Sequence, residues 1–253
     1  DGAEVRHIVL GFEHAPCTIL EGQSVGVIPP GFDDIGRPHH IRLYSVASAR
    51  DGEQPGQPHV AFTVKRVLAD HHGQPVRGVC SNYLCDLPVG SQVSVTGPVG
   101  DTFLMPDAPM TSLLMICTGT GIAPMRGMIQ RRARLPRHLG GPLALFYGGR
   151  VPAELPYHDD LQALPAGLVD LHLAYSRVPG QPKRYVQDLL REQSELVSRL
   201  ILRERCYVYL CGLTGMEKGV HDALTEILRS AGADWDQLQP QLVSDGRYHV
   251  EVY

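Results

Sequence analysis

The first 107 residues consist of short apolar runs that alternate with polar positions and are broken by Gly and Pro. Alternation over four to eight residues is typical of half-buried strands, and the cluster "DGEQPGQP" at 51–58 is typical of a turn. One short helix is expected at 81–87, with Ser81 as its N-cap. Together these patterns predict a small antiparallel β-barrel. Its expected strands are 5–11, 24–29, 41–47, 59–67 and 92–97.

From about residue 111 the pattern changes to apolar strands that alternate with helical stretches. This alternation predicts a parallel sheet covered on both faces, which binds ligands beyond the carboxyl ends of its strands at the switch point in strand order. The fold class is therefore two-domain, β followed by α/β, with a barrel at 1–107 and a Rossmann-like domain at 108–253. The segment "MPDAPMT" at 105–111 is the expected boundary. The expected strands are 112–117, 143–148, 168–175 and 206–211, and the expected helices lie near 124–134, 184–203 and 215–231.

The last six residues, "YHVEVY", alternate like a strand and end on an aromatic ring. Chain ends are usually polar and frayed, because a short tail seldom buries enough surface to offset the entropy of ordering it. The strand pattern predicts that Tyr253 and its carboxylate are held in place. The residues alone leave two interpretations open, a packed sheet end or a ring with a function.

Composition excludes several classes. The 23 Lys and Arg against 27 Asp and Glu give a net charge of −4, so no general attraction to nucleic acid is expected. No apolar run reaches the roughly 18 residues of a membrane span, and no integral membrane segment is expected. The six cysteines form no C-x-x-C, so we expect no metal site, reduced thiols and a cytoplasmic location. The chain begins with neither Met nor a signal segment, and an upstream domain is compatible with this start.

The glycine-rich stretch "CTGTGIAPMR" at 117–126 follows the first apolar strand of the second half and leads into a helix. Its glycines would let backbone amides approach a phosphate at the helix N-terminus. The third position of the usual fingerprint is Ala123 followed by Pro124, not Gly. Nucleotide binding and a plain strand-to-helix turn both remain open at this point.

The stretch "RLYS" at 42–45 lies in a barrel strand. Alternation places Arg42 and Tyr44 on one face and Leu43 and Ser45 on the other. A guanidinium beside an aromatic ring suits a phosphate and a flat ring, while an ordinary strand with an exposed Arg is the alternative.

Two further stretches carry candidate chemistry. "SRVPGQPKRY" at 176–185 gathers a hydroxyl, cations and a tyrosine that suit the 2′-phosphate of NADP, with a solvated loop as the alternative. "YLCGLTGMEKGV" at 209–220 repeats the strand, glycine turn and helix, and places Cys211 at the strand's carboxyl end, facing the cleft. A buried small residue is the alternative for that cysteine.

The strings "GVCSNYLCDL" (78–87), "TGPVG" (96–100), "TGTGIAP" (118–124), "CGLTGME" (211–217) and "VEVY" (250–253) occur in the order and spacing of one family. The chain resembles the plant-type ferredoxin–NADP reductase family nearly end to end. The resemblance implies an FAD-binding barrel, an NADP-binding α/β domain, and ferredoxin or another iron–sulfur carrier as partner. The implied enzyme passes hydride between NADPH and FAD and single electrons between FAD and the carrier.

Carried over by position, the resemblance implies that Arg42 holds the FAD pyrophosphate with Cys80 and Ser81. Tyr44 and Tyr253 would stack on the two flavin faces, and Tyr253 would move aside for nicotinamide. The implied catalytic residues are Ser45, Cys211, Glu251 and Tyr253. The implied cofactor-binding residues are Arg42, Leu43, Tyr44, Ser45, Val64, Lys65, Val79, Cys80, Ser81, Thr120, Gly121, Ser176, Arg177, Lys183, Tyr185, Gly212, Leu213 and Tyr253.

The chain departs from the family pattern in two places. Ala69 stands near the position of a tyrosine that stacks on FAD adenine, and His71 or His72 is expected to substitute. The loop 33–40, "DDIGRPHH", lacks the many lysines that plastid-type members present to ferredoxin. The alternatives are the reductase component of an oxygenase, of the benzoyl-coenzyme A epoxidase type, or of a diflavin system. A third alternative is a sensor that binds FAD and NADPH without turnover.

Overall fold

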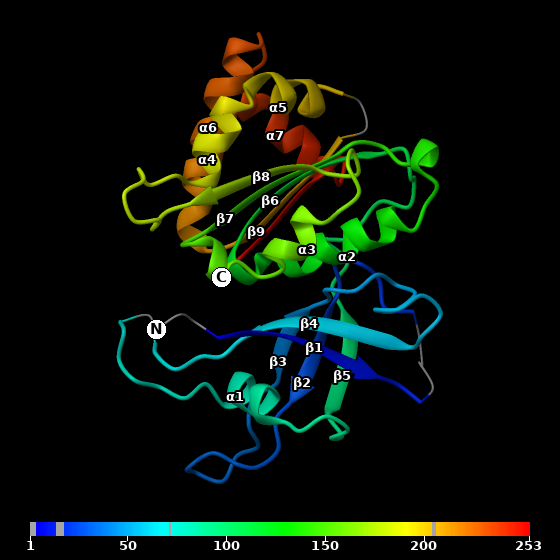
Figure 1. Ribbon diagram of the computed structural model, residues 1–253, viewed down its shortest axis with the longest axis vertical. Helices are drawn as coiled ribbons and strands as arrows, with labels where there is room; N and C mark the ends of the chain where they lie inside the picture. The colour runs from blue at the N-terminus through cyan, green and yellow to red at the C-terminus, as the bar shows by residue number, and fades with distance from the viewer. Residues whose placement is uncertain (1–3, 14–17, 71, 204–205) are drawn as a thin grey trace.

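A computed structural model describes residues 4–13, 18–70, 72–203 and 206–253 of the chain (Figure 1). Two halves lie one above the other in this view. The lower half holds strands β1 to β5, and the upper half holds a sheet covered by helices. The C-terminus lies at the edge of the upper half that faces the lower half.

The lower half is built from two small antiparallel sheets. One pairs β1 with β4, and the other has the order β3-β2-β5. A bridge between Val46 and Phe62 and a backbone bond from the Ala47 amide to the Ala61 carbonyl, at 2.7 Å, join them into a barrel. The predicted antiparallel barrel is confirmed. The strands are β1 (Val5–Gly11), β2 (Ser24–Ile28), β3 (Arg42–Ser45), β4 (His59–Lys65) and β5 (Ser94–Val99).

The helix of the lower half, α1 (Val79–Asp86), starts earlier than predicted. Its N-cap is Gly78, and the prediction of Ser81 as the cap is wrong. Ser81 is the third helical residue, and its hydroxyl donates back to the Gly78 carbonyl at 3.3 Å and accepts the Val67 amide at 3.2 Å. The hydroxyl therefore ties the helix to the chain after β4 and does not cap the first turn.

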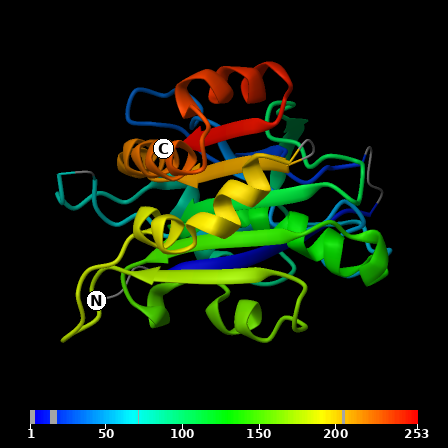
Figure 2. The same ribbon diagram turned by 90° about the horizontal axis from the view of Figure 1, so that it is seen from above.

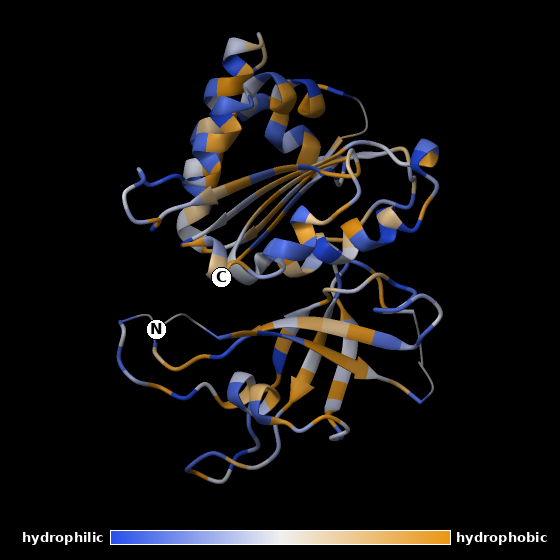
Figure 3. Ribbon diagram, in the orientation of Figure 1, coloured by the Kyte–Doolittle hydropathy of each residue, from blue (hydrophilic) through white to orange (hydrophobic). Residues whose placement is uncertain are grey.

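The upper half contains one parallel sheet with the order β10-β9-β6-β7-β8, which confirms the predicted α/β class. The chain leaves β6 towards β7 and β8 on one side and returns to β9 and β10 on the other, so the switch point lies between β6 and β9. The middle strands are buried. Figure 3 shows hydrophobic residues along the sheet. The strands are β6 (Ser112–Thr118), β7 (Leu143–Gly149), β8 (Asp170–Tyr175), β9 (Cys206–Gly212) and β10 (Tyr248–Val252).

Helices cover both faces of this sheet (Figures 1 and 2). On the side facing the barrel lie α2 (Ile122–Ala133) and the short α3 (His158–Gln162), and their core includes Met125, Met128 and Leu161. The other face carries α4 to α7 around a core that includes Leu190, Leu224 and Trp235. These helices are α4 (Val186–Glu192), α5 (Ser194–Ile201), α6 (Thr214–Ser230) and α7 (Trp235–Ser244).

Two features of the helices differ from the sequence prediction. The single helix expected at 184–203 is two helices, because Gln193 leaves helical geometry at φ −103 and ψ 33. Helix α7 was not predicted, and Pro240 inside it hides its pattern. None of the helices in the described part of the chain is long and apolar enough to cross a membrane.

Helix α2 also docks on the barrel. Gly127 lies so close to the barrel that a Cβ there would be 2.8 Å from the Ser48 carbonyl oxygen. The guanidinium of Arg126 donates to both carboxylate oxygens of Glu53, at 2.9 and 2.6 Å, and to the Ala47 carbonyl at 2.8 Å. The close approach at Gly127 and the charged hydrogen bonds between Arg126 and Glu53 thus hold the α/β half against the barrel.

Candidate functional site

The barrel side of the candidate site centres on Arg42. Its side chain is exposed at the start of β3, and among the described residues it donates only to the neighbouring Ile41 carbonyl, at 3.2 Å. It forms no ion pair within the described residues. Burial raises the pKa of the nearby Cys80 thiol, while a hydrogen bond with Tyr44 and the positive charge of Arg42 lower it in part. Arg42, Tyr44 and Cys80 are therefore neighbours.

The start of α1 completes an anion-binding environment. Gly78 provides no side-chain cap, and the first turn holds no acidic residue. Uncapped amides at a helix N-terminus attract phosphate oxygens, and a guanidinium without a carboxylate partner does the same. The surroundings of Arg42 therefore fit a pyrophosphate.

The same region offers apolar surface and an aromatic ring. Leu43 is 60% exposed and Val79 is 48% exposed, which is unusual for such side chains. Tyr44 is half-buried, with its ring 5.8 Å from that of Phe62, and burial raises the pKa of its phenol. Exposed apolar side chains beside a fixed ring suit the flat part of a flavin. Together with the anion environment, they fit FAD.

The other predicted barrel residues differ in accessibility. Ser45 is half-buried at the end of β3, opposite Ser24 of β2. Val64 is fully buried in the barrel core, whereas Lys65 is exposed. Ser81 is 7% exposed at the start of α1. Of the two histidines expected near adenine, His71 lies outside the described residues, and His72 is exposed.

On the α/β side, two glycines shape the switch point. A Cβ at Gly121 would lie 2.2 Å from the Cys211 carbonyl oxygen, and a Cβ at Gly212, where φ is +145, would lie 2.3 Å from the Thr118 hydroxyl. That hydroxyl instead accepts the Leu213 amide at 3.2 Å. The turns after β6 and β9 can meet only because both positions lack a side chain.

Cys211 lies beside Glu251 in the pairing of β9 with β10. Its thiol is only 3% exposed, so the side chain does not open freely to the cleft. Burial and the neighbouring Glu251 raise the pKa of Cys211 to about 12, and burial also raises the pKa of Glu251. A thiol that stays protonated is a poor nucleophile, which favours a positioning role.

Tyr253 is anchored through its backbone and one hydrogen bond. Its amide donates to the Gly212 carbonyl at 2.9 Å, and its own carbonyl accepts the Thr214 amide at 3.2 Å. Its phenol lies 2.6 Å from the Thr120 hydroxyl, yet the residue is 59% exposed. The tail is therefore an ordered strand whose final ring remains accessible at the switch point.

The proposed 2′-phosphate residues lie beyond β8 and at the start of α4. Ser176 donates its hydroxyl to the Gly149 carbonyl at 3.3 Å. Arg177 and Lys183 are exposed, and neither forms an ion pair within the described part of the chain. Tyr185 is 46% exposed directly before α4. Two free cations with a hydroxyl and an accessible ring suit a phosphorylated adenosine.

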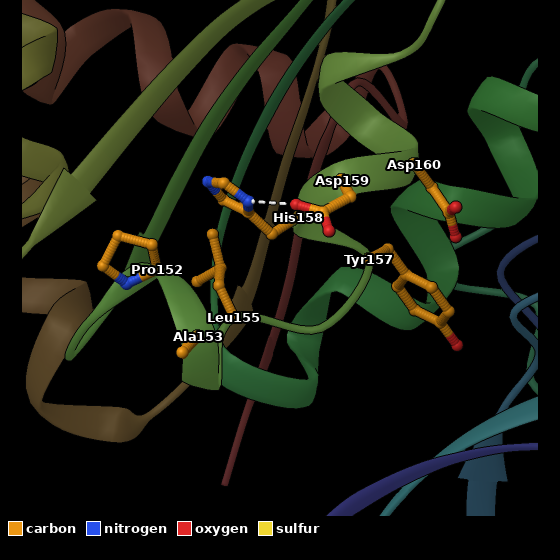
Figure 4. A pocket seen from close by; sticks show the side chains of 7 residues that line it. All are labelled: Pro152, Ala153, Leu155, Tyr157, His158, Asp159 and Asp160. Carbon is orange, nitrogen blue, oxygen red and sulfur yellow. Dashed lines mark hydrogen bonds and ion pairs between the residues drawn. The ribbon is translucent and has the colours of Figure 1, made fainter.

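One surface hollow, of about 450 Å³, lies beside the loop after β7 (Figure 4). Asp159 and Asp160 line it, and the Asp159 carboxylate is 2.8 Å from the His158 Nδ1 atom. Two carboxylates make this hollow unfavourable for a phosphate. Tyr157 also lines the hollow, and its hydroxyl lies 2.7 Å from that of Thr63 in the barrel.

Arg150 is a candidate binding residue that the sequence analysis missed. It is exposed and directly follows β7, and its carbonyl accepts the Arg177 amide at 2.8 Å. Its place after the apolar run "LALFYGG" was the available signal. Among the described residues, no group of three His, Cys, Asp or Glu side chains could hold a metal ion.

A comparison with protein families matches residues 115–222 to the oxidoreductase NAD-binding domain. This match, with an antiparallel barrel and a glycine-lined switch point, defines the class as NAD-binding-domain oxidoreductases. The chain is 38% identical to the cyanelle ferredoxin–NADP reductase of Cyanophora paradoxa, over 99% of this chain and 71% of that protein. It is 36% identical to the ferredoxin–NADP reductase of Spirulina sp., over 98% and 88% of the two chains.

A plant relative gives the same result. Leaf isozyme 1 of the chloroplastic ferredoxin–NADP reductase of Oryza sativa subsp. indica is 39% identical, over 99% of this chain and 72% of that protein. The chain belongs to the ferredoxin–NADP reductase family, which confirms the resemblance found in its motifs.

Proposed function

We propose that this chain is an FAD-dependent oxidoreductase that connects NADP(H) with a one-electron iron–sulfur carrier of the ferredoxin type. The observation that carries the proposal is the meeting of Thr120, Cys211 and Tyr253 at the switch point. This meeting occurs in a chain that aligns with ferredoxin–NADP reductases over nearly its whole length.

In this proposal the barrel holds FAD. Arg42 and the first turn of α1, with Cys80 and Ser81, bind the pyrophosphate, and the exposed apolar side chains of Leu43 and Val79 contact the cofactor. Tyr44 and Tyr253 supply the aromatic rings for the flavin. Ser45 follows Tyr44 in β3, and Val64 and Lys65 end β4. When bound, FAD supplies the conversion between hydride transfer and single-electron transfer.

The α/β half binds NADPH as substrate. Thr120, Gly121, Gly212 and Leu213 border the nicotinamide end, and the phosphorylated adenosine is received by Ser176, Arg177, Lys183 and Tyr185. Each charge-assisted hydrogen bond contributes roughly 1.5–3 kcal/mol when well formed, and solvent lowers this at exposed side chains. The two cations thus favour NADPH over NADH.

The residues at the switch point mainly orient the reacting groups. Cys211 stays a neutral thiol and fixes one side of the nicotinamide position. Glu251, whose pKa is raised by burial, can hold or pass a proton. Tyr253 covers the switch point in the resting protein and moves aside for the substrate ring, since a stacking contact contributes only about 0.5–1.5 kcal/mol beyond area burial.

The relatives support a ferredoxin-type carrier as partner. They are named ferredoxin–NADP reductases, not oxygenase reductases. We also propose a cytoplasmic location. The five cysteines of the described residues are free and buried, as suits a reducing compartment, although some relatives are named as chloroplastic or cyanelle proteins.

The test is reduction of a small plant-type ferredoxin by the purified chain with NADPH, coupled to cytochrome c. We expect turnover that requires FAD, NADPH and ferredoxin together. Turnover with FAD and NADPH but without ferredoxin would exclude the proposed carrier. Binding of NADP⁺ with no reduction of any acceptor would contradict the proposal and favour a nucleotide sensor.

A further inference from the structure

Arg150 occupies a place in the sheet that the assignments above leave without a role. It is the first residue after β7, and β7 lies between β6 and β8 in the strand order (Figure 2). Thr120 lies beyond β6, and Tyr253 lies beyond β10, where its amide bonds to the Gly212 carbonyl at the end of β9. Ser176 and Arg177 lie beyond β8. The end of β7 therefore separates the two regions proposed to bind NADPH.

The strand order fixes the path of a dinucleotide between these regions. Neighbouring strands are about 4.8 Å apart, so the ends of β6 and β8 are separated by roughly 10 Å. A dinucleotide with its nicotinamide at the β6–β9 switch point and its adenosine beyond β8 must cross the end of β7. The part of the molecule that lies between the two nucleosides is the pyrophosphate.

The side chain at this crossing has the right chemistry. Arg150 is exposed and forms no ion pair with any carboxylate of the described residues. Its backbone is fixed, because its carbonyl accepts the Arg177 amide at 2.8 Å. Asp159, in the first turn of α3, is hydrogen-bonded to His158. A guanidinium with five donors and no competing carboxylate suits two adjacent phosphates.

We propose that Arg150 binds the pyrophosphate of the nicotinamide dinucleotide. This inference rests on the proposed function of the α/β half, and it assigns to Arg150 a phosphate different from the one given to Arg177 and Lys183. The pyrophosphate is common to NADPH and NADH. Arg150 therefore contributes affinity for both nucleotides and no preference between them.

The experiment is calorimetric titration of the FAD-loaded protein with two ligands, 2′-phospho-ADP-ribose and adenosine 2′-monophosphate. Both carry the 2′-phosphate, and only the first carries the pyrophosphate. For Arg150→Ala we expect about tenfold weaker binding of 2′-phospho-ADP-ribose and a change of less than about twofold for the monophosphate. For Arg177→Ala we expect both ligands to bind more weakly.

Two controls keep the result interpretable. Arg150→Lys keeps the charge and should recover part of the lost affinity. Arg229→Ala removes one charge from an exposed position in the last turn of α6, at the end of that helix far from the carboxyl end of β9, and should leave both titrations unchanged. Within the described residues Arg150 is hydrogen-bonded through its backbone alone, so truncation of its side chain should leave thermal unfolding unaltered.

Equal affinity of Arg150→Ala and the unsubstituted protein for 2′-phospho-ADP-ribose would overturn the inference. Equal weakening of both ligands would also overturn it, because it would assign Arg150 to the 2′-phosphate. A different result would contradict the proposed function itself: the unsubstituted protein would bind neither ligand, or it would transfer no electrons from NADPH.

Discussion

The phenol of Tyr253 lies 2.6 Å from the hydroxyl of Thr120, and this bond joins the last residue of the chain to the glycine turn after β6. The turn and the tail come from opposite ends of the α/β half, 133 positions apart. Tyr253 thus covers the switch point, held by one side-chain hydrogen bond and by backbone bonds to Gly212 and Thr214. A ring held in this way can be displaced without unfolding β10.

The first prediction concerns how strongly the Tyr253 ring competes with the nucleotide for the switch point. Tyr253→Ala should bind NADP⁺ about tenfold more tightly, because the nucleotide no longer displaces a stacked and hydrogen-bonded ring. Tyr253→Phe keeps the ring and loses only the bond to Thr120, so it should bind about three- to fivefold more tightly. Titration of the FAD-loaded protein with NADP⁺ measures both.

Thr120→Val removes the same hydrogen bond from the other side, at a residue that also borders the proposed nicotinamide position, and is therefore a second probe of this bond. It should resemble Tyr253→Phe in nucleotide affinity. Unchanged affinity in Tyr253→Ala would mean that the ring does not compete with the nucleotide.

The second prediction concerns the choice of nucleotide. Arg177 and Lys183 are exposed cations without an ion-pair partner in the described residues. Arg177→Ala combined with Lys183→Ala should lower the NADPH to NADH ratio of kcat/KM by about 10² to 10³, with NADH activity nearly constant. Steady-state kinetics with both nucleotides gives the ratio, and an unaltered ratio would remove these residues from the 2′-phosphate site.

The third prediction concerns a buried arginine. Arg132 is 3% exposed, and its guanidinium donates to the Thr111 carbonyl at 3.1 and 3.2 Å and to the Gly141 carbonyl at 2.8 Å. Desolvation lowers its pKa to about 10, with a smaller contribution from the charge of Arg131. Arg132→Ala leaves two carbonyls unpaired and should cost about 2–4 kcal/mol in the free energy of unfolding.

Urea unfolding measures this cost, and Arg229→Ala serves as the exposed control, with an expected change within about 0.5 kcal/mol. A loss at Arg132 as small as that at Arg229 would contradict a structural role for the buried guanidinium.

The fourth prediction concerns acid stability at the junction of the two halves. Burial alone would raise the pKa of Glu53, but hydrogen bonds from His7 and Arg126 outweigh it, and the pKa lies below its ordinary value. A carboxyl with a lowered pKa stabilises the fold above its unfolded value of about 4.3, and this contribution is lost as the pH falls below it. The stability of the unsubstituted protein should therefore exceed that of Glu53→Gln at pH 7.

The difference between the two proteins should shrink between about pH 5 and pH 3. Urea unfolding of both proteins across this range shows whether the stability difference falls or rises with falling pH. A difference that stays constant or grows as the pH falls would contradict the assignment of the lowered pKa to the folded state.

Much of the α/β half could be predicted, because β6, β7 and β9 are continuous apolar runs of strand length. Helix α7 could not be predicted, because Pro240 and scattered polar residues obscure the helical spacing of its apolar residues. The cap of α1 was predicted wrongly because Ser81 is a favourable cap residue by type, and only the fold shows that its hydroxyl is bonded to Gly78 and Val67. Local propensity cannot identify a partner that lies 14 positions away.

Some residues of the candidate site could likewise be predicted from the sequence, and others could not. Tyr253, Cys211 and the "TGTG" turn were identified by motif, and the structure brings them together at the switch point. The contacts between the two halves could not be predicted from the sequence, because they join residues far apart along the chain. Glu21 is completely buried and its carboxylate accepts hydrogen bonds from Arg50 and Arg131, a pairing across 110 positions in the case of Arg131. Arg150 was missed because its proposed role depends on the strand order, which a single strand pattern does not give.

The central claim is that the two halves together bring NADPH to a flavin held by the barrel. Anaerobic rapid mixing of the FAD-loaded protein with NADPH, followed at the flavin absorbance band, tests it most directly. The account predicts loss of the band on the timescale of catalysis, much faster with NADPH than with NADH. Protein that takes up no FAD, or bound FAD whose band NADPH leaves unchanged, would contradict it.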